Sequence, residues 1–221
     1  MSGRPGEDLP DGRGRTNLQT VGQDLSGNPA VAVDRVEVIS DGWHVLRRTT
    51  FSYRRRDGVI ESQQRETYDR GNGATILLYD PRRDSVVLVR QLRIPAYLNG
   101  HSGWLLETPA GLLDGDHPAE AIKREVMEET GYLVTDVRPV FQAFMSPGAV
   151  TETVHFFTAI IDVTVRAEDG GGAAHEDEDI EVLEIPLADA MAMIDSGEIC
   201  DGKTIMLLQW AMLNRAELAI A

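Results

Sequence analysis

The alternation of hydrophobic and polar residues changes along the chain. From residue 31 to about residue 68, β-branched, aromatic and charged residues are mixed, a pattern typical of strands with one covered and one exposed face. The triplet Arg56-Asp57-Gly58 predicts a hairpin turn within this stretch. We therefore predict an antiparallel sheet with strands at Val31–Ser40, Trp43–Tyr53 and Ile60–Tyr68.

The following part of the chain has the pattern of a sheet flanked by helices. Near-continuous apolar runs indicate buried strands, and the segment Pro118–Thr130 has a proline at its start and Gly131 just past its end, as helices commonly do. The predicted strands are Ala74–Tyr79, Ser85–Val89 and Val154–Val165, and the other predicted helices are Leu187–Ile194 and Thr204–Leu218. The pattern favours an α+β fold in which a sheet lies between helices, with an extra β layer in front.

The amino terminus differs from both regions. Residues 1–30 contain six glycines and three prolines among polar residues, without apolar periodicity, so we expect a disordered tail. The predicted organisation is this tail, an N-terminal β layer at residues 31–70 and a larger domain at residues 71–221.

Composition limits the partners and the location. The chain of 221 residues has 21 basic and 36 acidic side chains, a net charge of −15, which is the wrong sign for following a nucleic-acid backbone. A single cysteine, Cys200, allows no intrachain disulfide. No stretch approaches the roughly 18 apolar residues of a membrane span, and the start lacks the apolar core of a signal peptide. We therefore expect a cytoplasmic protein without a nucleic-acid or membrane partner.

The predicted helix at Pro118–Thr130 carries the candidate chemistry. At about 100° per residue, Glu129 lies about 40° from Glu125, and Glu128 about 60° to its other side, so three like charges share one face. Such carboxylates repel one another unless a cation lies between them, and hard oxygen ligands on one helix face suit Mg²⁺. From these three residues alone, a solvated acidic helix face is the favoured interpretation, and the segment before the helix changes this.

The residues around this helix resemble a known motif. The run Arg124-Glu125-Val126-Met127-Glu128-Glu129-Thr130-Gly131-Tyr132 matches the second half of the Nudix box, G-x5-E-x7-R-E-U-x-E-E-x-G-U. The first half, which begins at Gly111, is one residue short, so its glutamate position falls on Asp116 or on His117. The resemblance implies a Nudix-type α-β-α sandwich with a mixed sheet and a metal-dependent hydrolase. The departure puts the support of the loop in doubt rather than the metal ligands.

The resemblance extends beyond the box, from about residue 36 to about residue 215. The segments Tyr68–Ala74, Arg90–Arg93 and Met145–Gly148 resemble the nucleoside-diphosphate-sugar and ADP-ribose pyrophosphatase branch. The shortened box and the segments Thr151–Phe157, Glu176–Glu181 and Ser196–Thr204 are similar to the GDP-mannose pyrophosphatase family. That family implies a homodimer that exchanges its N-terminal β layer, so that each active site includes residues of the other subunit.

The resemblance also implies the site residues. It places the metal on Glu125, Glu129, Glu178 and the backbone oxygen of Ala110. It places nucleotide-sugar contacts on Trp43, Gln64, Arg65, Glu66, Arg93, Glu152, Asp177 and Lys203, the first four from the other subunit. These residue types fit the task, because Arg93 and Lys203 can bind a diphosphate and Trp43 can stack on a base. Without the resemblance, ordinary structural roles are the favoured interpretation of all three residues.

The expected reaction is Mg²⁺-dependent hydrolysis of GDP-mannose to GMP and mannose 1-phosphate. Glu125, Glu128, Glu129 and Glu178 are the expected catalytic carboxylates, with Glu178 as the candidate base on a loop that closes over the metal. A solvated acidic loop is the alternative for residues 168–179. Two other functions stay open: the same hydrolysis of ADP-ribose or another sugar nucleotide, and a non-catalytic Nudix module that senses a nucleotide sugar.

Overall fold

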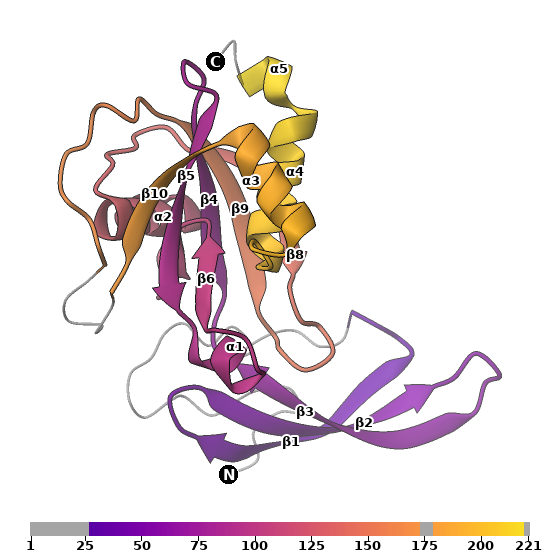
Figure 1. Cartoon of the computed structure of the whole chain (residues 1–221). Helices are drawn as coiled ribbons and strands as arrows, with labels where there is room; N and C mark the ends of the chain where they lie inside the picture. Colours follow the sequence, from indigo (N-terminus) through magenta and orange to yellow (C-terminus); the bar gives the residue numbers. More distant parts are fainter. Residues whose placement is uncertain (1–26, 173–178, 219–221) are drawn as a thin grey trace. The chain divides into compact units, whose positions relative to one another are not determined.

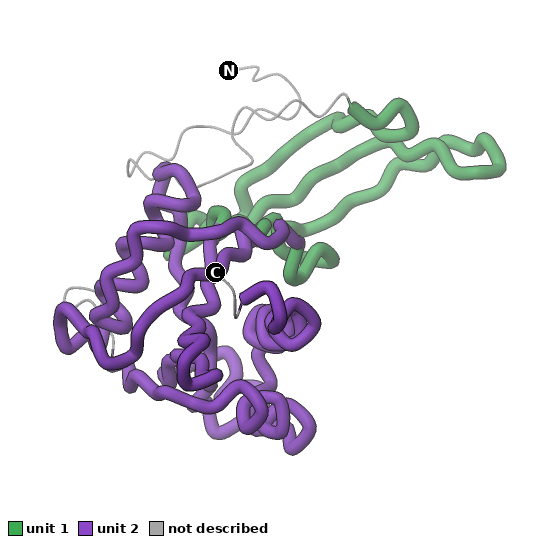
Figure 2. Tube along the Cα trace, turned by 90° about the horizontal axis from the view of Figure 1, so that it is seen from above, with its two compact units in different colours: residues 1–72, 144–153 green, residues 73–143, 154–221 purple. Residues whose placement is uncertain are grey.

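The computed structural model describes residues 27–172 and 179–218. The described chain forms two compact units (Figure 2). Unit 1 consists of residues 27–72 and 144–153, and unit 2 consists of residues 73–143 and the described part of 154–221. The amino-terminal tail predicted at residues 1–30 lies mostly outside the described residues. No described helix combines the length and the apolar character that spanning a membrane requires.

Unit 1 is built on a three-stranded antiparallel sheet (Figure 1). Its strands are β1 (Val31–Asp41), β2 (Val45–Arg54) and β3 (Ile60–Asp69), in the order β1-β2-β3. The predicted hairpin turn is present, since Gly58 has φ 85° and donates its N–H to the carbonyl of Arg55 at 3.0 Å. The predicted N-terminal β layer is confirmed, and its strands begin and end within two residues of the predicted positions.

A buried ion pair joins the last two strands of this sheet. Arg47 Nη1 of β2 lies 2.8 Å from Asp69 Oδ2 at the end of β3, and the two side chains are 4% and 0% exposed. The other oxygen of Asp69 accepts the N–H of Gly71 at 3.1 Å. The pair fixes the place where the chain leaves the sheet, because removing one partner would leave a buried charge without compensation.

Unit 2 contains a seven-stranded mixed sheet. Its strand order is β10-β5-β4-β9-β8, with β6 added to β5 and β7 added to β4. β4 runs parallel to β9 but antiparallel to β5 and β7. The bounds are β4 Gly73–Asp80, β5 Ser85–Leu92, β6 Trp104–Glu107, β7 Ala110–Leu112, β8 Arg138–Phe144, β9 Thr153–Ile160 and β10 Glu181–Pro186.

Helices cover both faces of this sheet. They are α1 (Ile94–Leu98), α2 (Pro118–Thr130), α3 (Leu187–Ser196), α4 (Gly202–Leu213) and α5 (Arg215–Leu218). In Figure 1, α2 lies on one side of the sheet, and α3 and α4 lie on the other. The predicted α-β-α sandwich with a mixed sheet is therefore confirmed.

The central strand β4 explains why the sequence shows no alternation there. All eight of its residues are buried, because successive side chains point to opposite faces and both faces are covered. Ile76 belongs to a core cluster with Ile122 and Val126 of α2. Thr75, on the opposite face, hydrogen-bonds Thr108 at 2.8 Å. β4 thus carries the site-bearing helix on one face and a polar network on the other.

Several elements differ from the prediction. The third predicted strand of the body ends at Ile160 rather than Val165, because Asp162 accepts the N–H of Thr164 at 2.9 Å and forms a turn. The last predicted helix is divided at Asn214 into α4 and α5. The sequence patterns did not indicate α1, β6, β7, β8 or β10.

Candidate active site

Helix α2 begins and ends where the sequence predicts. Pro118 opens it, the side chain of His117 accepts the N–H of Ala119 at the N-cap, and Gly131 closes it in the left-handed region with φ 72°. His117, one of the two residues at the shortened position of the box, therefore has a helix-capping role. The other, Asp116, lies 3.6 Å from Arg124 Nη1. The loop thus has support of its own without the missing glutamate.

Two carboxylates of α2 lie against strand β7. Glu129 is 1% exposed, and its Oε2 accepts the N–H of Ala110 at 3.2 Å. The carboxylate of Glu125 packs on Gly111 so closely that a Cβ at this position would overlap it. Glu125 is also 3.1 Å from Arg124 Nη2. The structure thus brings together three of the four predicted metal-ligating residues, Ala110, Glu125 and Glu129.

These residues fit a hard divalent cation. The donors that Glu125 and Glu129 offer are carboxylate oxygens, and Gly111 leaves the space that one of the carboxylates fills. Between residues 27 and 172 and between 179 and 218, no three Asp, Glu, His or Cys side chains form a complete ligand group. The predicted fourth ligand, Glu178, and the predicted substrate contact Asp177 lie outside the described residues.

A loop of residues 166–172 closes the carboxyl end of α2. Gly172 donates its N–H to the carbonyl of Glu128 at 3.0 Å, and Gly171 donates to Glu129 at 2.9 Å. Arg166 Nε reaches the carbonyl of Thr130 at 2.7 Å. These donors satisfy carbonyls that a helix end otherwise leaves without partners, and they hold in place the backbone of the turn that carries Glu128 and Glu129.

A cation pair lies beside the carboxylate helix. The Arg93 guanidinium bonds Glu107, with Nη2 2.6 Å from Oε2, and Lys203 Nζ is 3.4 Å from Glu107 Oε1 and 3.0 Å from Asp201 Oδ2. Burial alone would lower the pKa of Arg93, but hydrogen bonding and attraction from Glu107, with further attraction from Glu129 and Asp201, raise it. Arg93 therefore lies within electrostatic range of the predicted metal ligand Glu129.

The remaining predicted contacts belong to unit 1. Trp43 is 85% exposed, as a stacking platform requires. Glu66 pairs with Arg48 at 2.7 Å, and Glu152 lies 3.6 Å from Arg70. On β3, Gln64 and Glu66 are two residues apart and share a face, while Arg65 points to the other face.

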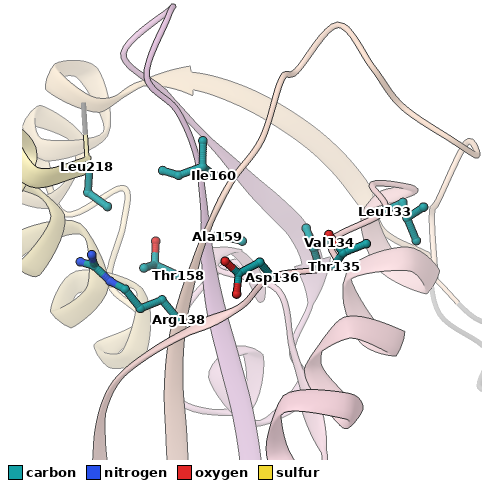
Figure 3. A pocket seen from close by; sticks show the side chains of 9 residues that line it. All are labelled: Leu133, Val134, Thr135, Asp136, Arg138, Thr158, Ala159, Ile160 and Leu218. Carbon is teal, nitrogen blue, oxygen red and sulfur yellow. The ribbon is translucent and has the colours of Figure 1, made fainter. Parts of the chain in front are cut away.

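Figure 3 shows a pocket of about 230 Å³ elsewhere in unit 2. None of the described residues that line it is a predicted site residue, and the charged ones among them are Asp136 and Arg138. The pocket is lined by Leu133, Val134, Thr135, Asp136, Arg138, Thr158, Ala159, Ile160 and Leu218.

Sequence reasoning missed Glu107 and Asp201. Both are acidic residues that hold the two cations, and Glu107 is 3% exposed. The available signal was a lone glutamate at the end of the apolar run Trp104–Leu106 and just before Thr108-Pro109-Ala110. A charge in that position is unusual in a short buried strand and indicates a partner.

Comparison with known proteins identifies the family of this chain. The model of the NUDIX domain matches residues 69–208, and the model described as the GDP-mannose pyrophosphatase NudK N-terminal domain matches residues 30–68. The chain therefore belongs to the Nudix hydrolase family, whose members generally use divalent metal ions.

Within this family, the chain is similar to proteins named GDP-mannose pyrophosphatase. The chain is 53% identical over 185 residues to the GDP-mannose pyrophosphatase of Pectobacterium atrosepticum, covering 82% of this chain and 95% of that one. It is 53% identical over 175 residues to that of Citrobacter koseri, covering 79% and 91%. A crystal structure of an ADP compounds hydrolase is similar in fold, with a TM-score of 0.62 and 18% identity over 82% of this chain and 94% of that chain.

Proposed function

We propose that this enzyme hydrolyses the pyrophosphate bond of GDP-mannose and releases GMP and mannose 1-phosphate, with Mg²⁺ as the metal ion. One arrangement carries the proposal: Glu129 of α2 bonds the N–H of Ala110, and Glu107, three residues earlier in the chain, holds both Arg93 and Lys203. A diphosphate needs both kinds of group at once, a metal to neutralise it and fixed donors to orient it. The 53% sequence identity to two GDP-mannose pyrophosphatases supports GDP-mannose as the sugar nucleotide.

Each residue has a distinct task in this proposal. Glu125, Glu129, Glu178 and the carbonyl of Ala110 hold the ion, and Glu128 supports this ligand shell. These residues would hold a magnesium ion, which would supply charge neutralisation at the diphosphate and lower the pKa of a bound water. Arg93 and Lys203 bind phosphate oxygens and stabilise the charge that develops on them as the P–O–P bond breaks. Glu178 takes the proton of the attacking water.

The other contacts complete substrate recognition. Trp43 offers a plane on which the base stacks, and Gln64, Arg65 and Glu66 contact the nucleotide sugar from the partner subunit. Glu152 and Asp177 contact it from the same subunit as the metal ligands. The presence of Glu125, Glu128 and Glu129 together argues against a non-catalytic sensor, which has no need of a complete metal-binding helix face.

The enzyme works as a homodimer that exchanges its N-terminal β layer in this proposal. Taken alone, unit 1 supports this, because a three-stranded sheet leaves large apolar side chains uncovered: Trp43 is 85%, Ile60 58% and Val38 49% exposed. We place the enzyme in the cytoplasm, which suits a chain whose only cysteine allows no intrachain disulfide. Sedimentation analysis of the purified protein tests the dimer, and a monomer at micromolar concentration would refute it.

A substrate panel tests the activity. The purified protein is incubated with GDP-mannose, GDP-glucose or ADP-ribose, with Mg²⁺ or with a chelator, and the products are separated by chromatography. We expect GMP and mannose 1-phosphate from GDP-mannose, only with the metal. A higher kcat/KM for ADP-ribose would refute the substrate, and the absence of metal-dependent products from all three would refute the proposed function.

A variant pair tests the metal ligands in the same assay. Glu129→Gln should lose most turnover and stay folded, because the amide keeps the shape but removes the charge. Glu120→Gln is the matched control, since Glu120 lies on the same helix but forms an exposed pair with Lys123 at 3.0 Å. Wild-type kcat in the Glu129 variant would show that this carboxylate does not hold the metal.

A further inference from the structure

Glu107 is a buried carboxylate that lies between the two cations of the site. It ends strand β6 and is 3% exposed, whereas the side chain of Arg93 is 39% exposed. Its carboxylate accepts hydrogen bonds from Arg93 Nε at 3.1 Å and Nη2 at 2.6 Å, and from Gln91 Nε2 at 3.4 Å. Its Oε1 lies 3.4 Å from Lys203 Nζ. One buried carboxylate is therefore shared by both cations.

The two cations come from distant parts of the chain. Arg93 lies between β5 and α1, and Lys203 is the second residue of α4. Without a shared counter-charge they would repel each other and move apart into solvent. Glu107 joins them, so the spacing between the two cations is set by the buried end of β6.

The geometry also sets which edge of Arg93 is presented. Glu107 takes the Nε and Nη2 donors, and within the described ranges the structure gives Nη1 no partner. A guanidinium held along one edge in this way turns its other edge outward, where a phosphate can accept two parallel hydrogen bonds.

Thr108, the residue after Glu107, also holds the backbone next to Lys203 in place. The N–H of Thr108 donates to Thr204 Oγ1 at 2.7 Å, and that hydroxyl donates to Asp201 Oδ2 at 2.7 Å. Asp201 also lies 3.0 Å from Lys203 Nζ. The peptide of residues 107–108 is thus anchored to the start of α4 through its side chain and its backbone.

We propose that Glu107 is a positioning residue that holds Arg93 and Lys203 at the spacing of a bound diphosphate. This inference rests on the proposed function, because the ligand is the diphosphate of the nucleotide sugar. Glu107 itself does not touch the substrate. It acts by keeping two donors ordered before the substrate arrives, so that no reorganisation is needed when charge develops on the phosphates.

Two substitutions separate positioning by charge from simple packing. Glu107→Gln keeps the volume but turns a donor toward the cations, whereas Glu107→Asp keeps the charge but shortens the side chain. If charge positions the cations, the aspartate variant is the more active of the two, and the glutamine variant loses about 10- to 100-fold in kcat/KM, chiefly in kcat. If Glu107 only fills space, the order is reversed.

The control and the second measurement keep the test independent of the proposed substrate. Glu184→Gln removes a carboxylate that holds Arg83 at 3.2 Å on the same sheet, and it should leave kcat/KM unchanged. Calorimetric titration with inorganic pyrophosphate needs no turnover, and it should give affinities in the order wild type, Glu107→Asp, Glu107→Gln. If the glutamine variant does not fold, the aspartate variant is the test: it should have both a lower kcat/KM and a lower pyrophosphate affinity than the wild type.

The possible failures are distinguishable. If the wild-type enzyme hydrolyses no nucleotide sugar, the proposed function is wrong, and pyrophosphate titration still decides the role of Glu107. If the wild-type enzyme is active and Glu107→Gln retains its kcat/KM and its pyrophosphate affinity, the positioning role is wrong and the function stands.

Discussion

Replacing Gly111 by alanine tests the proposed metal site with the smallest possible change. The Cβ of an alanine at this position would lie 2.5 Å from Glu125 Oε1 and nearer still to Cδ. Ordinary contact begins near 3.4 Å, so the carboxylate has to move by about 1 Å or more. Gly111 is outside the set of glycines with positive φ, so alanine adds no backbone strain. The added methyl group therefore acts on Glu125 rather than on the fold.

The size of the effect follows from this displacement. A misplacement of about 1 Å in a reacting geometry can cost about 100-fold in rate. The far end of a flexible side chain can yield at small cost, so we expect the melting temperature of Gly111→Ala to stay close to that of the wild type. The expected result is a loss of about 100-fold in kcat with an intact fold, measured by product formation and by thermal unfolding.

Matched variants make this result specific. Gly148→Ala introduces the same methyl group where nothing lies within 4 Å, so it should change neither property. Glu125→Asp withdraws the carboxylate by one methylene and should itself have a lower kcat. Adding Gly111→Ala to this variant should lower kcat by a much smaller factor than it does in the wild type. Full activity of Gly111→Ala with an unchanged fold would mean that Glu125 works from another position.

Two further predictions concern the stability of unit 2. Gly170→Ala should destabilise the protein by about 1–3 kcal/mol, because Gly170 has φ +64° and an added Cβ would lie 2.6 Å from the backbone of Thr130. Gly197 is the control position: it has φ +82° but open space around it, so Gly197→Ala measures the cost of the backbone conformation alone. Equal losses in the two variants, measured by urea unfolding, would refute the steric argument. The pKa of His155 is lowered by burial and then by repulsion from His117, so the unfolded chain binds a proton more readily and stability falls as the pH drops below about 6.5. His155→Gln should therefore lose less melting temperature than the wild type between pH 7.5 and 5.5, and an equal loss would contradict this.

The elements predicted correctly from the sequence are those whose boundaries are marked by residues within the segment itself. Helix α2 was placed correctly because proline at its start and glycine past its end are signals within the segment itself. The division of the last helix at Asn214 was missed because no proline or glycine marks it. Strands β6 and β7 have four and three residues, too few for any periodicity to be recognised.

The site was predicted only as far as a motif describes it. The contacts of Glu129 with Ala110 and of Glu125 with Gly111 join residues that lie in the motif or directly before it. Glu107 belongs to no such motif, because its role exists only when β5, β6 and the start of α4 meet. Such an arrangement depends on long-range packing, and the residue types alone do not specify it.

The balance of charge in unit 2 links the metal to substrate binding. Arg93 and Lys203 are already compensated in the free protein by Glu107 and Asp201. They therefore offer a diphosphate well-directed hydrogen bonds but little net attraction, in a chain whose net charge is −15.

Glu125 and Glu129 add further negative charge beside these cations and would repel a diphosphate on their own. In the proposed site, a divalent cation on these two carboxylates would cancel that repulsion. If the proposed site is correct, the same pair of side chains would make the metal a condition for binding the substrate as well as for activating water, and the arginine and the lysine would set the orientation of the substrate.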